Sequence, residues 1–462
     1  MFYKINSAVS AFVWGPPMLA VFLATGIYLS VKSRFYQITG IGDWLRSTVF
    51  SLCRKGKEKS RAEGSISQFG ALTSALAACL GTGNIVGVAA ALCSGGAGSL
   101  FWMCASAVMG MMTCCCENIL GVKYRVKDAN GNYRGGPMYY IERGLGMKGL
   151  AGAYAVLLTG ASLGMGNMTQ ANSVAQGMAA FGVPPAVSGI ILAVTVAVAV
   201  SGGLKRISAI SEKLIPVLSA AFVVACFIII GKNAENLVPS LKSVFREAFT
   251  VRAVSGYGMA KAMRYGISRG VFSNEAGLGS SAIIHAAADC KSPAEQGKWG
   301  ILEVFIDTVL MCTVTGAAIL VSGKWSPMTE LNGVELCAAV FESVFGKAGG
   351  YFLSISICLF AFATLIAWSY YGKSGVEYIF GGKSGKIYNV FYVAAAFAGS
   401  VMRFDGVWNL SDTFNGLMAV PNIFSLFLLS KEAVGLLREN TDRLNSGRIR
   451  IANRLTGKIN FR

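Results

Sequence analysis

Long apolar runs recur along this chain of 462 residues, and they limit its fold more than any other feature. A helix needs about 20 apolar residues to cross the hydrocarbon core of a bilayer. Only 14% of the residues are charged, against about 25% in an average soluble domain. The sequence therefore predicts an all-α polytopic membrane protein with about 11 transmembrane helices. The predicted spans are roughly 14–31, 67–92, 98–120, 150–178, 186–203, 211–231, 256–288, 299–322, 349–372, 387–402 and 411–430.

Loops that are rich in basic residues alternate with loops that contain few of them. The chain has 41 Lys and Arg against 23 Asp and Glu, and most of the basic residues follow spans 1, 3, 5, 7, 9 and 11. Cytoplasmic loops carry such an excess. We therefore expect a multi-pass cell-membrane protein with its N-terminus outside and its C-terminus in the cytoplasm. The tail from Lys431 is expected to lie against anionic lipid headgroups, and no nucleic-acid partner is expected.

Two of the spans contain glycine and polar residues at their centres. Span 2 reads GTGN at residues 81–84, and span 7 reads SNEAGLG at residues 273–279. Glycine weakens a helix interior, and unwound backbone at membrane depth is tolerated where it lines a cavity. Paired interrupted helices point to the binding site of a transporter. The alternative is that these glycines only allow close helix packing.

Each of the two interrupted spans is the first member of a set of five spans. With span 1 set aside as one extra N-terminal helix, spans 2–6 and spans 7–11 form a five-plus-five inverted repeat with a broken first helix in each repeat. This spacing predicts four segments along the chain. They are the N-terminal helix and basic cytoplasmic loop (1–66), the first repeat (67–231), an external loop with the second repeat (232–430), and a basic cytoplasmic tail (431–462).

Five motifs resemble the alanine or glycine:cation symporter family. They are GTGNIVGVA at 81–89, GGPMYYIE at 135–142, SRGVFSNEAGLGS at 268–280, WSYYG at 368–372 and WNLSD at 408–412. The resemblance, from about residue 10 to 430, implies a leucine-transporter-type fold. It also implies a secondary active symporter that imports alanine or glycine with Na⁺ by alternating access. Coupling to H⁺ and a preference for glutamine are the alternatives, and no organic cofactor is implied.

The first break offers groups for the carboxylate of an amino acid. Backbone N–H groups where a half-helix restarts can bind an anion, and we assign this role to Thr82, Gly83 and Asn84. Asn167 and Gln170 lie three residues apart on span 4, so they share a helix face. Their amides either donate to the substrate or join packed helices, and the sequence favours neither.

The second break offers acceptors for the ammonium group. Carbonyls freed near Phe272 and Ser273 would serve, with Glu275 as an acceptor at longer range. Trp368, together with Phe272 and Met165, would limit the size of the pocket, although an aromatic ring in a helix bundle is usually plain packing.

Sodium requires oxygen ligands. The unwound carbonyls of span 2 at Ala77 and Leu80 are the expected donors. The resemblance to the wider fold places a matching hydroxyl on span 9, and Thr364 is the residue near its middle. The alternative for Thr364 is a hydroxyl bonded to the carbonyl four residues earlier in its own helix.

Ionisable residues inside spans are costly and often functional. Glu303 and Asp307 share one face of span 8, where a proton relay or ion gate is one interpretation and pairing with a basic group is the favoured one. His285 is the only histidine, and we expect it to be neutral and hydrogen-bonded. Arg269 is a candidate to pair with an acid at an outer gate.

The sequence offers few of the motifs that other functional classes would need. A channel would need a repeated selectivity filter, and a membrane enzyme would need a nucleophile–base set or a metal cluster. The sequence has one histidine and no GxxxxGK[ST] loop, which argues against an enzyme and an ATP-driven pump. Nothing in the sequence indicates an oligomeric state.

Overall fold

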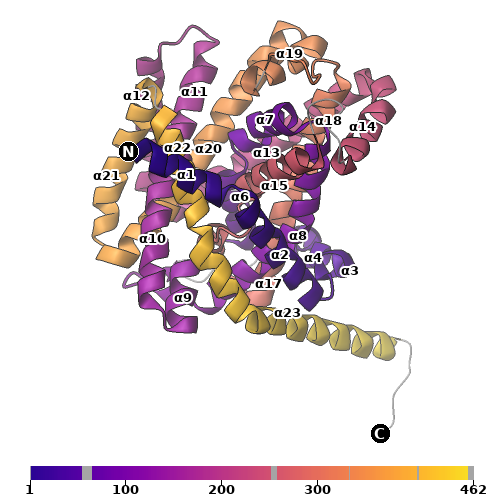
Figure 1. Ribbon diagram of the computed structural model, residues 1–462. Coiled ribbons are helices and arrows are strands. Elements are labelled where there is room, and N and C mark those ends of the chain that lie inside the picture. The colour runs from indigo at the N-terminus through magenta and orange to yellow at the C-terminus, as the bar shows by residue number, and fades with distance from the viewer. Residues whose placement is uncertain (1, 55–64, 251–257, 332, 403–404, 456–462) are drawn as a thin grey trace.

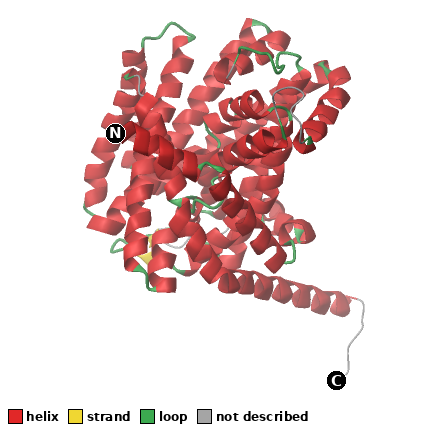
Figure 2. Cartoon of the chain, viewed as in Figure 1, coloured by secondary structure: helices red, strands yellow, loops and turns green. Residues whose placement is uncertain are grey.

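The computed structural model describes residues 2–54, 65–250, 258–331, 333–402 and 405–455, almost entirely as helices (Figures 1 and 2). Four basic residues of the first predicted cytoplasmic loop lie outside the described residues, namely Lys55, Lys57, Lys59 and Arg61. The start of predicted span 7, residues 256–257, also lies outside them.

In the first half of the chain the described residues mainly form helices. They are α1 (Phe2–Val13), α2 (Pro16–Lys32), α3 (Tyr36–Thr39), α4 (Ile41–Ser47), α5 (Val49–Arg54), α6 (Gln68–Cys79), η1 (Thr82–Asn84), α7 (Val86–Gly95), α8 (Gly98–Lys123), α9 (Pro137–Leu145), α10 (Lys148–Leu163), η2 (Gly164–Met168), α11 (Thr169–Ala179), α12 (Pro185–Ser201) and α13 (Gly203–Lys232). A short antiparallel hairpin between α8 and α9 consists of β1 (Val126–Lys127) and β2 (Tyr133–Arg134), with Val126 opposite Arg134.

The second half is also mainly helical over its described residues. It consists of η3 (Ala234–Asn236), α14 (Leu237–Phe249), α15 (Met259–Asn274), α16 (Ser281–His285), α17 (Pro293–Val304), η4 (Phe305–Cys312), α18 (Thr313–Val321), α19 (Gly333–Phe345), α20 (Lys347–Phe380), α21 (Ser384–Val401), α22 (Asp405–Leu417) and α23 (Ala419–Leu455).

Seven described segments are long and apolar enough to cross a membrane. They correspond to predicted spans 1, 3, 4, 6, 8, 9 and 11, and run over Asn6–Lys32, Gly98–Lys123, Lys148–Ala179, Gly203–Lys232, Pro293–Val321, Lys347–Phe380 and Ser411–Arg443. Spans 2 and 5 appear as shorter apolar helices, and spans 7 and 10 are helical without meeting these criteria. The chain is a multi-pass membrane protein, and the count of eleven spans stays a prediction.

Both predicted breaks are present. The first separates α6 from α7 at Leu80–Ile85, where η1 forms a single tight turn. The second separates α15 from α16 and begins at Glu275, whose φ of 56° is left-handed. Gly277 and Gly279 follow with φ of 97° and 80°. Side chains rarely adopt such angles, so the glycines in this motif allow the chain to leave the helix.

Several elements were not predicted. π-Helical turns form at η2 in span 4 and at η4 in span 8, and such turns often mark functional sites. Helices α14 and α19 lie in connections that we predicted as loops. α8 occupies the middle of the bundle, where it packs against α2, α15 and α17.

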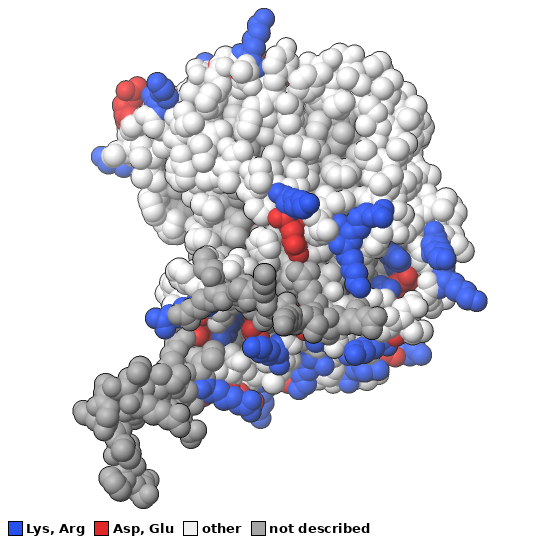
Figure 3. Space-filling model, turned by 180° about the vertical axis from the view of Figure 1, so that it is seen from behind, with Lys and Arg blue, Asp and Glu red and all other residues white. Residues whose placement is uncertain are grey.

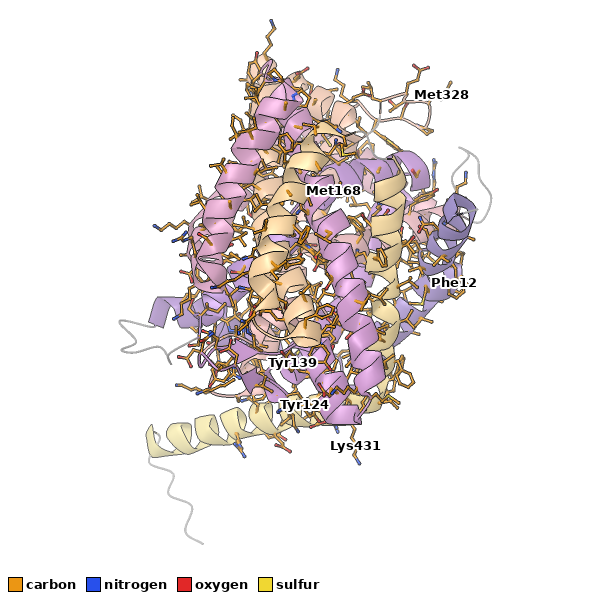
Figure 4. The ribbon with its side chains drawn as sticks, turned by 90° about the vertical axis from the view of Figure 1, so that its left-hand side faces the viewer. Phe12, Tyr124, Tyr139, Met168, Met328 and Lys431 are labelled. Atoms are coloured by element: carbon orange, nitrogen blue, oxygen red, sulfur yellow. The ribbon has the colours of Figure 1, made fainter. Side chains whose placement is uncertain are left out.

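The two ends of the bundle differ in composition. Tyr124, Tyr139 and Lys431 lie at one end, and Met328 lies at the other (Figure 4). We call the first the hairpin end and the second the α19 end. On the face seen in Figure 3, Lys and Arg gather over the lower part, which is the hairpin end.

Candidate functional site

The two breaks lie against each other in the interior. A Cβ atom placed on Gly83 would be 3.7 Å from the Cα atom of Ser273, so backbone of the first break packs on the end of α15. Asn84 and Ser273 both donate to the carboxylate of Asp307 in η4, at 2.8 and 2.9 Å. Residues some 190 positions apart in sequence therefore meet at one point, as the broken-helix hypothesis requires.

A cavity of about 580 Å³ begins at this point. Thr82, Gly83 and Phe272 line its inner part, and Lys347 and Tyr351 line it at the start of α20. α20 begins beside α19, so the cavity leads from the first break to the α19 end (Figure 1). A small solute can therefore reach three of the residues that we assigned to substrate binding.

The two amides of span 4 have different surroundings. Asn167, in the π-helical turn, donates to the carbonyl of Tyr392 on α21 at 2.7 Å, so it joins two helices. Gln170 donates weakly to Met165 O at 3.3 Å, and its Oε1 atom is buried without a hydrogen-bond partner. A Cβ placed on Gly81 would lie 3.5 Å from that oxygen. Of the two amides, Gln170 is the one beside the first break.

Glu275 and Trp368 contact each other beside the second break. Trp368 Nε1 donates to Glu275 Oε1 at 3.1 Å, and Ser280 donates to the other carboxylate oxygen. Both residues are buried, and neither is among the described residues that line the cavity. Trp368 instead covers Gly166, where any side chain would collide with the indole ring.

Two of the three predicted sodium ligands, Ala77 and Thr364, lie in contact. The Thr364 hydroxyl lies 3.0 Å from Ala77 O and 3.1 Å from Phe360 O, one turn earlier in its own helix. Ala77 O is available because the N–H of Gly81 turns to Cys79 O at the end of α6. Leu80 follows with a ψ of 73°, outside the helical range. The bond within its own helix is thus present, and the single hydroxyl proton of Thr364 lies between two carbonyls. The sodium-ligand role of Thr364 stays a prediction.

The buried acids of span 8 have separate partners. Glu303 contacts Nε2 of His285 at 3.0 Å and accepts from Ser281 at 2.7 Å. The Gln296 side-chain amide lies 2.6 Å from Nδ1 of His285, so both ring nitrogens have hydrogen-bond partners. His285 is hydrogen-bonded as expected, and its neutral state stays a prediction.

The favoured prediction of a basic partner for Asp307 is wrong for the described residues. Its carboxylate accepts from Asn84, Ser273 and Thr308 instead, and none of the described ion pairs includes Asp307. The reason is that Asp307 lies at the contact between the two breaks, where these neutral side chains surround it. Sequence spacing could not reveal this position.

Arg269 and Asp412 both line the cavity, as does Phe272. The guanidinium carbon of Arg269 lies 5.8 Å from the centre of the Phe272 ring. A gate between Arg269 and an acid stays a prediction, and Asp412 is the acid beside it on the cavity wall.

A contact that sequence reasoning missed lies at the hairpin end. Arg134, on β2, pairs with Glu377 of α20 at 2.8 Å and with Asp128 at 3.1 Å. Burial raises the pKa of Asp128, but hydrogen bonds from Asn132, Arg134 and Asn130 outweigh it and hold the pKa below 3.8. A second cavity of about 1090 Å³ at this end includes Arg134 and Glu377 but no residue of the first break.

Comparisons with known proteins agree with this architecture. A family model described as the sodium:alanine symporter family matches residues 1–453. The sodium/alanine symporter AgcS of Methanococcus maripaludis is 39% identical, over 93% of this chain and 95% of that protein. The probable sodium/glutamine symporter GlnT of Bacillus subtilis is 34% identical, over 94% of this chain and 90% of GlnT. A solved manganese transporter of Eremococcus coleocola superposes with a TM-score of 0.52 at 12% identity, over 80% of this chain and 78% of that one, which indicates a shared fold.

Proposed function

Because this chain belongs to the sodium:alanine symporter family, and is thus a transporter rather than an enzyme, we propose that it imports alanine or glycine together with Na⁺. The observation that carries the proposal is the meeting of the two breaks at the base of a cavity. Free backbone groups at membrane depth, in a place that a small solute can reach, suit a zwitterion that must leave water.

In the proposed substrate site, the backbone of Thr82, Gly83 and Asn84 binds the carboxylate. Gln170 assists, since its amide lies beside the same break. The ammonium group is accepted by the end of α15 at Phe272 and Ser273. Glu275 contributes at longer range, because Trp368 and Ser280 already occupy its oxygens. Asn167 is better assigned to helix packing, since its amide donates to Tyr392.

In the proposed sodium site, Ala77 and Leu80 supply carbonyl oxygens and Thr364 supplies its hydroxyl. The contact between Thr364 and Ala77 supports this assignment, because two oxygens from different helices already lie side by side. A cation could replace the shared hydroxyl proton as the partner of the Ala77 carbonyl.

The arrangement of the two ends suggests a direction of transport. We take the α19 end as external and the hairpin end as cytoplasmic, because Lys and Arg gather at the latter. The cavity then opens outward, and the contacts of Arg134 hold the cytoplasmic side closed. The tail after Lys431 would lie along anionic lipid headgroups. In alternating access, one five-helix repeat would move against the other around the two breaks.

The test is uptake of labelled alanine into proteoliposomes that contain the full chain, with and without an inward sodium gradient. Accumulation above equilibrium only with the gradient is the expected result. Equal flux in both conditions would contradict coupling and favour a facilitator. Replacing the sodium gradient by a proton gradient tests the alternative ion, and competition by glycine and glutamine tests the substrate.

A further inference from the structure

The second cavity, at the hairpin end, has a basic wall. Its volume is about 1090 Å³, and its described lining carries five basic and two acidic side chains, an excess of three positive charges. The basic residues are Arg134, Lys205, Lys373, Lys383 and Lys386, and the acidic residues are Asp128 and Glu377. The described lining of the first cavity carries two basic and three acidic side chains instead. The two cavities therefore favour solutes of opposite charge, and the second one suits an anion.

Three lysines account for this excess. Arg134 lies 2.8 Å from Glu377 and 3.1 Å from Asp128. Lys373 lies 3.7 Å from Glu377, so two basic and two acidic side chains balance one another. The other three basic residues are exposed, line the cavity and take part in none of the described ion pairs, and we call them the lysine triad: Lys205, Lys383 and Lys386. Like charges that line one cavity repel one another, and a bound anion would offset that repulsion.

The fold assembles the lysine triad from two turns that are far apart in sequence. Lys205 follows the turn from α12 to α13, and Lys383 and Lys386 lie at the turn from α20 to α21. α12 packs against α21 at the edge of the bundle, which brings the two turns to one cavity (Figure 1). Because α13 and α21 both begin there, the positive ends of two helix dipoles add to the charge of the lysines. Phosphate groups bind readily in such basic surroundings.

The same cavity borders an apolar surface on the outside of the bundle. Ile387 lines the cavity and is 62% exposed, and Val390, three residues further along α21, is 70% exposed. Val198, near the end of α12, is 59% exposed. In a multi-pass membrane protein, such exposed apolar side chains contact the acyl chains of lipids. A phospholipid therefore fits both surfaces, with its phosphate at the lysines and its acyl chains along the two helices, whereas a free phosphate ion would use only the first.

We propose that the lysine triad binds the headgroup of an anionic phospholipid whose acyl chains lie along α12 and α21. This inference goes beyond the transport of an amino acid with Na⁺, because neither solute takes part in it. It also differs from the attraction of the tail after Lys431 to a charged membrane surface, since it concerns one cavity with a defined wall. A lipid bound there would join the two turns and so support the packing of α12 against α21.

The experiment titrates the purified full chain, in a neutral detergent and without alanine, with phosphatidylglycerol or phosphatidylcholine, and native mass spectrometry counts the bound lipids. We expect the wild type to bind one phosphatidylglycerol at least about tenfold more tightly than phosphatidylcholine. The affinity for phosphatidylglycerol should fall at least about tenfold in the triad variant, which combines Lys205→Gln, Lys383→Gln and Lys386→Gln.

The matched control variant removes the same charge from exposed lysines outside the cavity lining, and it combines Lys148→Gln, Lys213→Gln and Lys291→Gln. This control should keep the wild-type affinity for phosphatidylglycerol. Equal affinity of the wild type and the triad variant would overturn the proposal, as would equal affinity of the wild type for the two lipids. Displacement of phosphatidylglycerol by an equal concentration of inorganic phosphate would also overturn it, because the site would then recognise a free phosphate and not a lipid.

The wild type supplies a second test if the triad variant is not recovered as folded protein. Salt screens the charge of exposed lysines, so the affinity of the wild type for phosphatidylglycerol should fall severalfold between about 0.1 M and about 1 M salt. The affinity for phosphatidylcholine should not fall with it. Binding of phosphatidylglycerol that does not change with salt would overturn the proposal.

Discussion

The hydroxyl of Thr364 on α20 lies 3.0 Å from the carbonyl oxygen of Ala77 on α6. This contact crosses from one predicted repeat to the other, and Ala77 lies three residues before Leu80, where the first break begins. The Thr364 hydroxyl donates to this carbonyl, and these two oxygens are the pair that we propose as sodium ligands.

Thr364→Ala removes a proposed sodium ligand, so we expect the sodium concentration for half-maximal alanine uptake to rise about tenfold or more. Thr364→Ser keeps the hydroxyl and should restore most of the affinity. Ser356→Ala is the matched control, because Ser356 is buried on the same helix and its hydroxyl bonds only to Phe352 O in its own helix. Unchanged sodium dependence in Thr364→Ala would refute the assignment.

Glycines at the first break should respond differently to the same added methyl group. A Cβ at Gly81 would lie 2.8 Å from the Thr364 hydroxyl oxygen, whereas one at Gly83 would make ordinary contacts at 3.7 Å. We expect Gly81→Ala to weaken sodium affinity and Gly83→Ala to keep measurable uptake.

Gly83→Leu should abolish uptake while the protein still reaches the membrane, because a large side chain would enter the cavity at the substrate backbone site. Uptake and surface expression are measured together. Normal uptake in Gly83→Leu would rule out the proposed carboxylate site.

Substitutions of the two amides of span 4 should have different effects on transport kinetics and stability. Gln170→Ala is expected to raise the KM for alanine about tenfold, since it removes a polar group beside the first break. Asn167→Ala should mainly lower thermal stability, by about 1 kcal/mol, because it removes the hydrogen bond to Tyr392 O. The opposite pattern would assign substrate binding to Asn167 and helix packing to Gln170.

Arg134→Gln removes the cation that joins the hairpin to α20, and we expect it to favour opening at the hairpin end. Access of a thiol reagent to single cysteines introduced at that end would rise, and the accumulation ratio for alanine would fall. Lys383→Gln is the control, because Lys383 lines the same cavity outside these ion pairs. Equal access in both variants would contradict a closing role.

The contact between Arg134 and Asp128 should persist in mild acid. The folded pKa of Asp128 is lowered below 3.8, so its stabilising effect is present above that value and is lost as the pH falls through the folded pKa. Reagent access at the hairpin end should therefore stay constant between about pH 5 and 8. A rise in access near pH 6 would indicate that another group controls closure.

The proposed orientation can be tested with two single cysteines. Met328 is 91% exposed at the α19 end, and Lys431 is exposed at the hairpin end (Figure 4). In intact cells an impermeant maleimide should label Met328→Cys, and it should label Lys431→Cys only after the membrane is permeabilised. The reverse result would invert the topology.

Much of the architecture could be predicted because it depends on local chemistry. Long apolar runs predicted helices that cross a membrane, and the glycine and polar residues near Gly83 and Gly277 predicted both breaks, because their effect on a helix acts within a few residues. The π-helical turns at Asn167 and Asp307 could not be predicted. The glycines of GMGNM at 164–168 indicate close packing equally well, and FIDTVLMC at 305–312 is mostly apolar, as in an ordinary membrane helix.

The sequence by itself thus determined the class of protein, the membrane helices and the place of each break. Only the tertiary structure decided which polar residues share a site. It separated Gln170 from Asn167, joined Thr364 to Ala77, and set Asp307 between the two breaks without a basic partner among the described residues. The physical reason is that burial and hydrogen bonding at these positions arise between helices far apart in sequence, whereas propensity and hydropathy report only on neighbours along the chain.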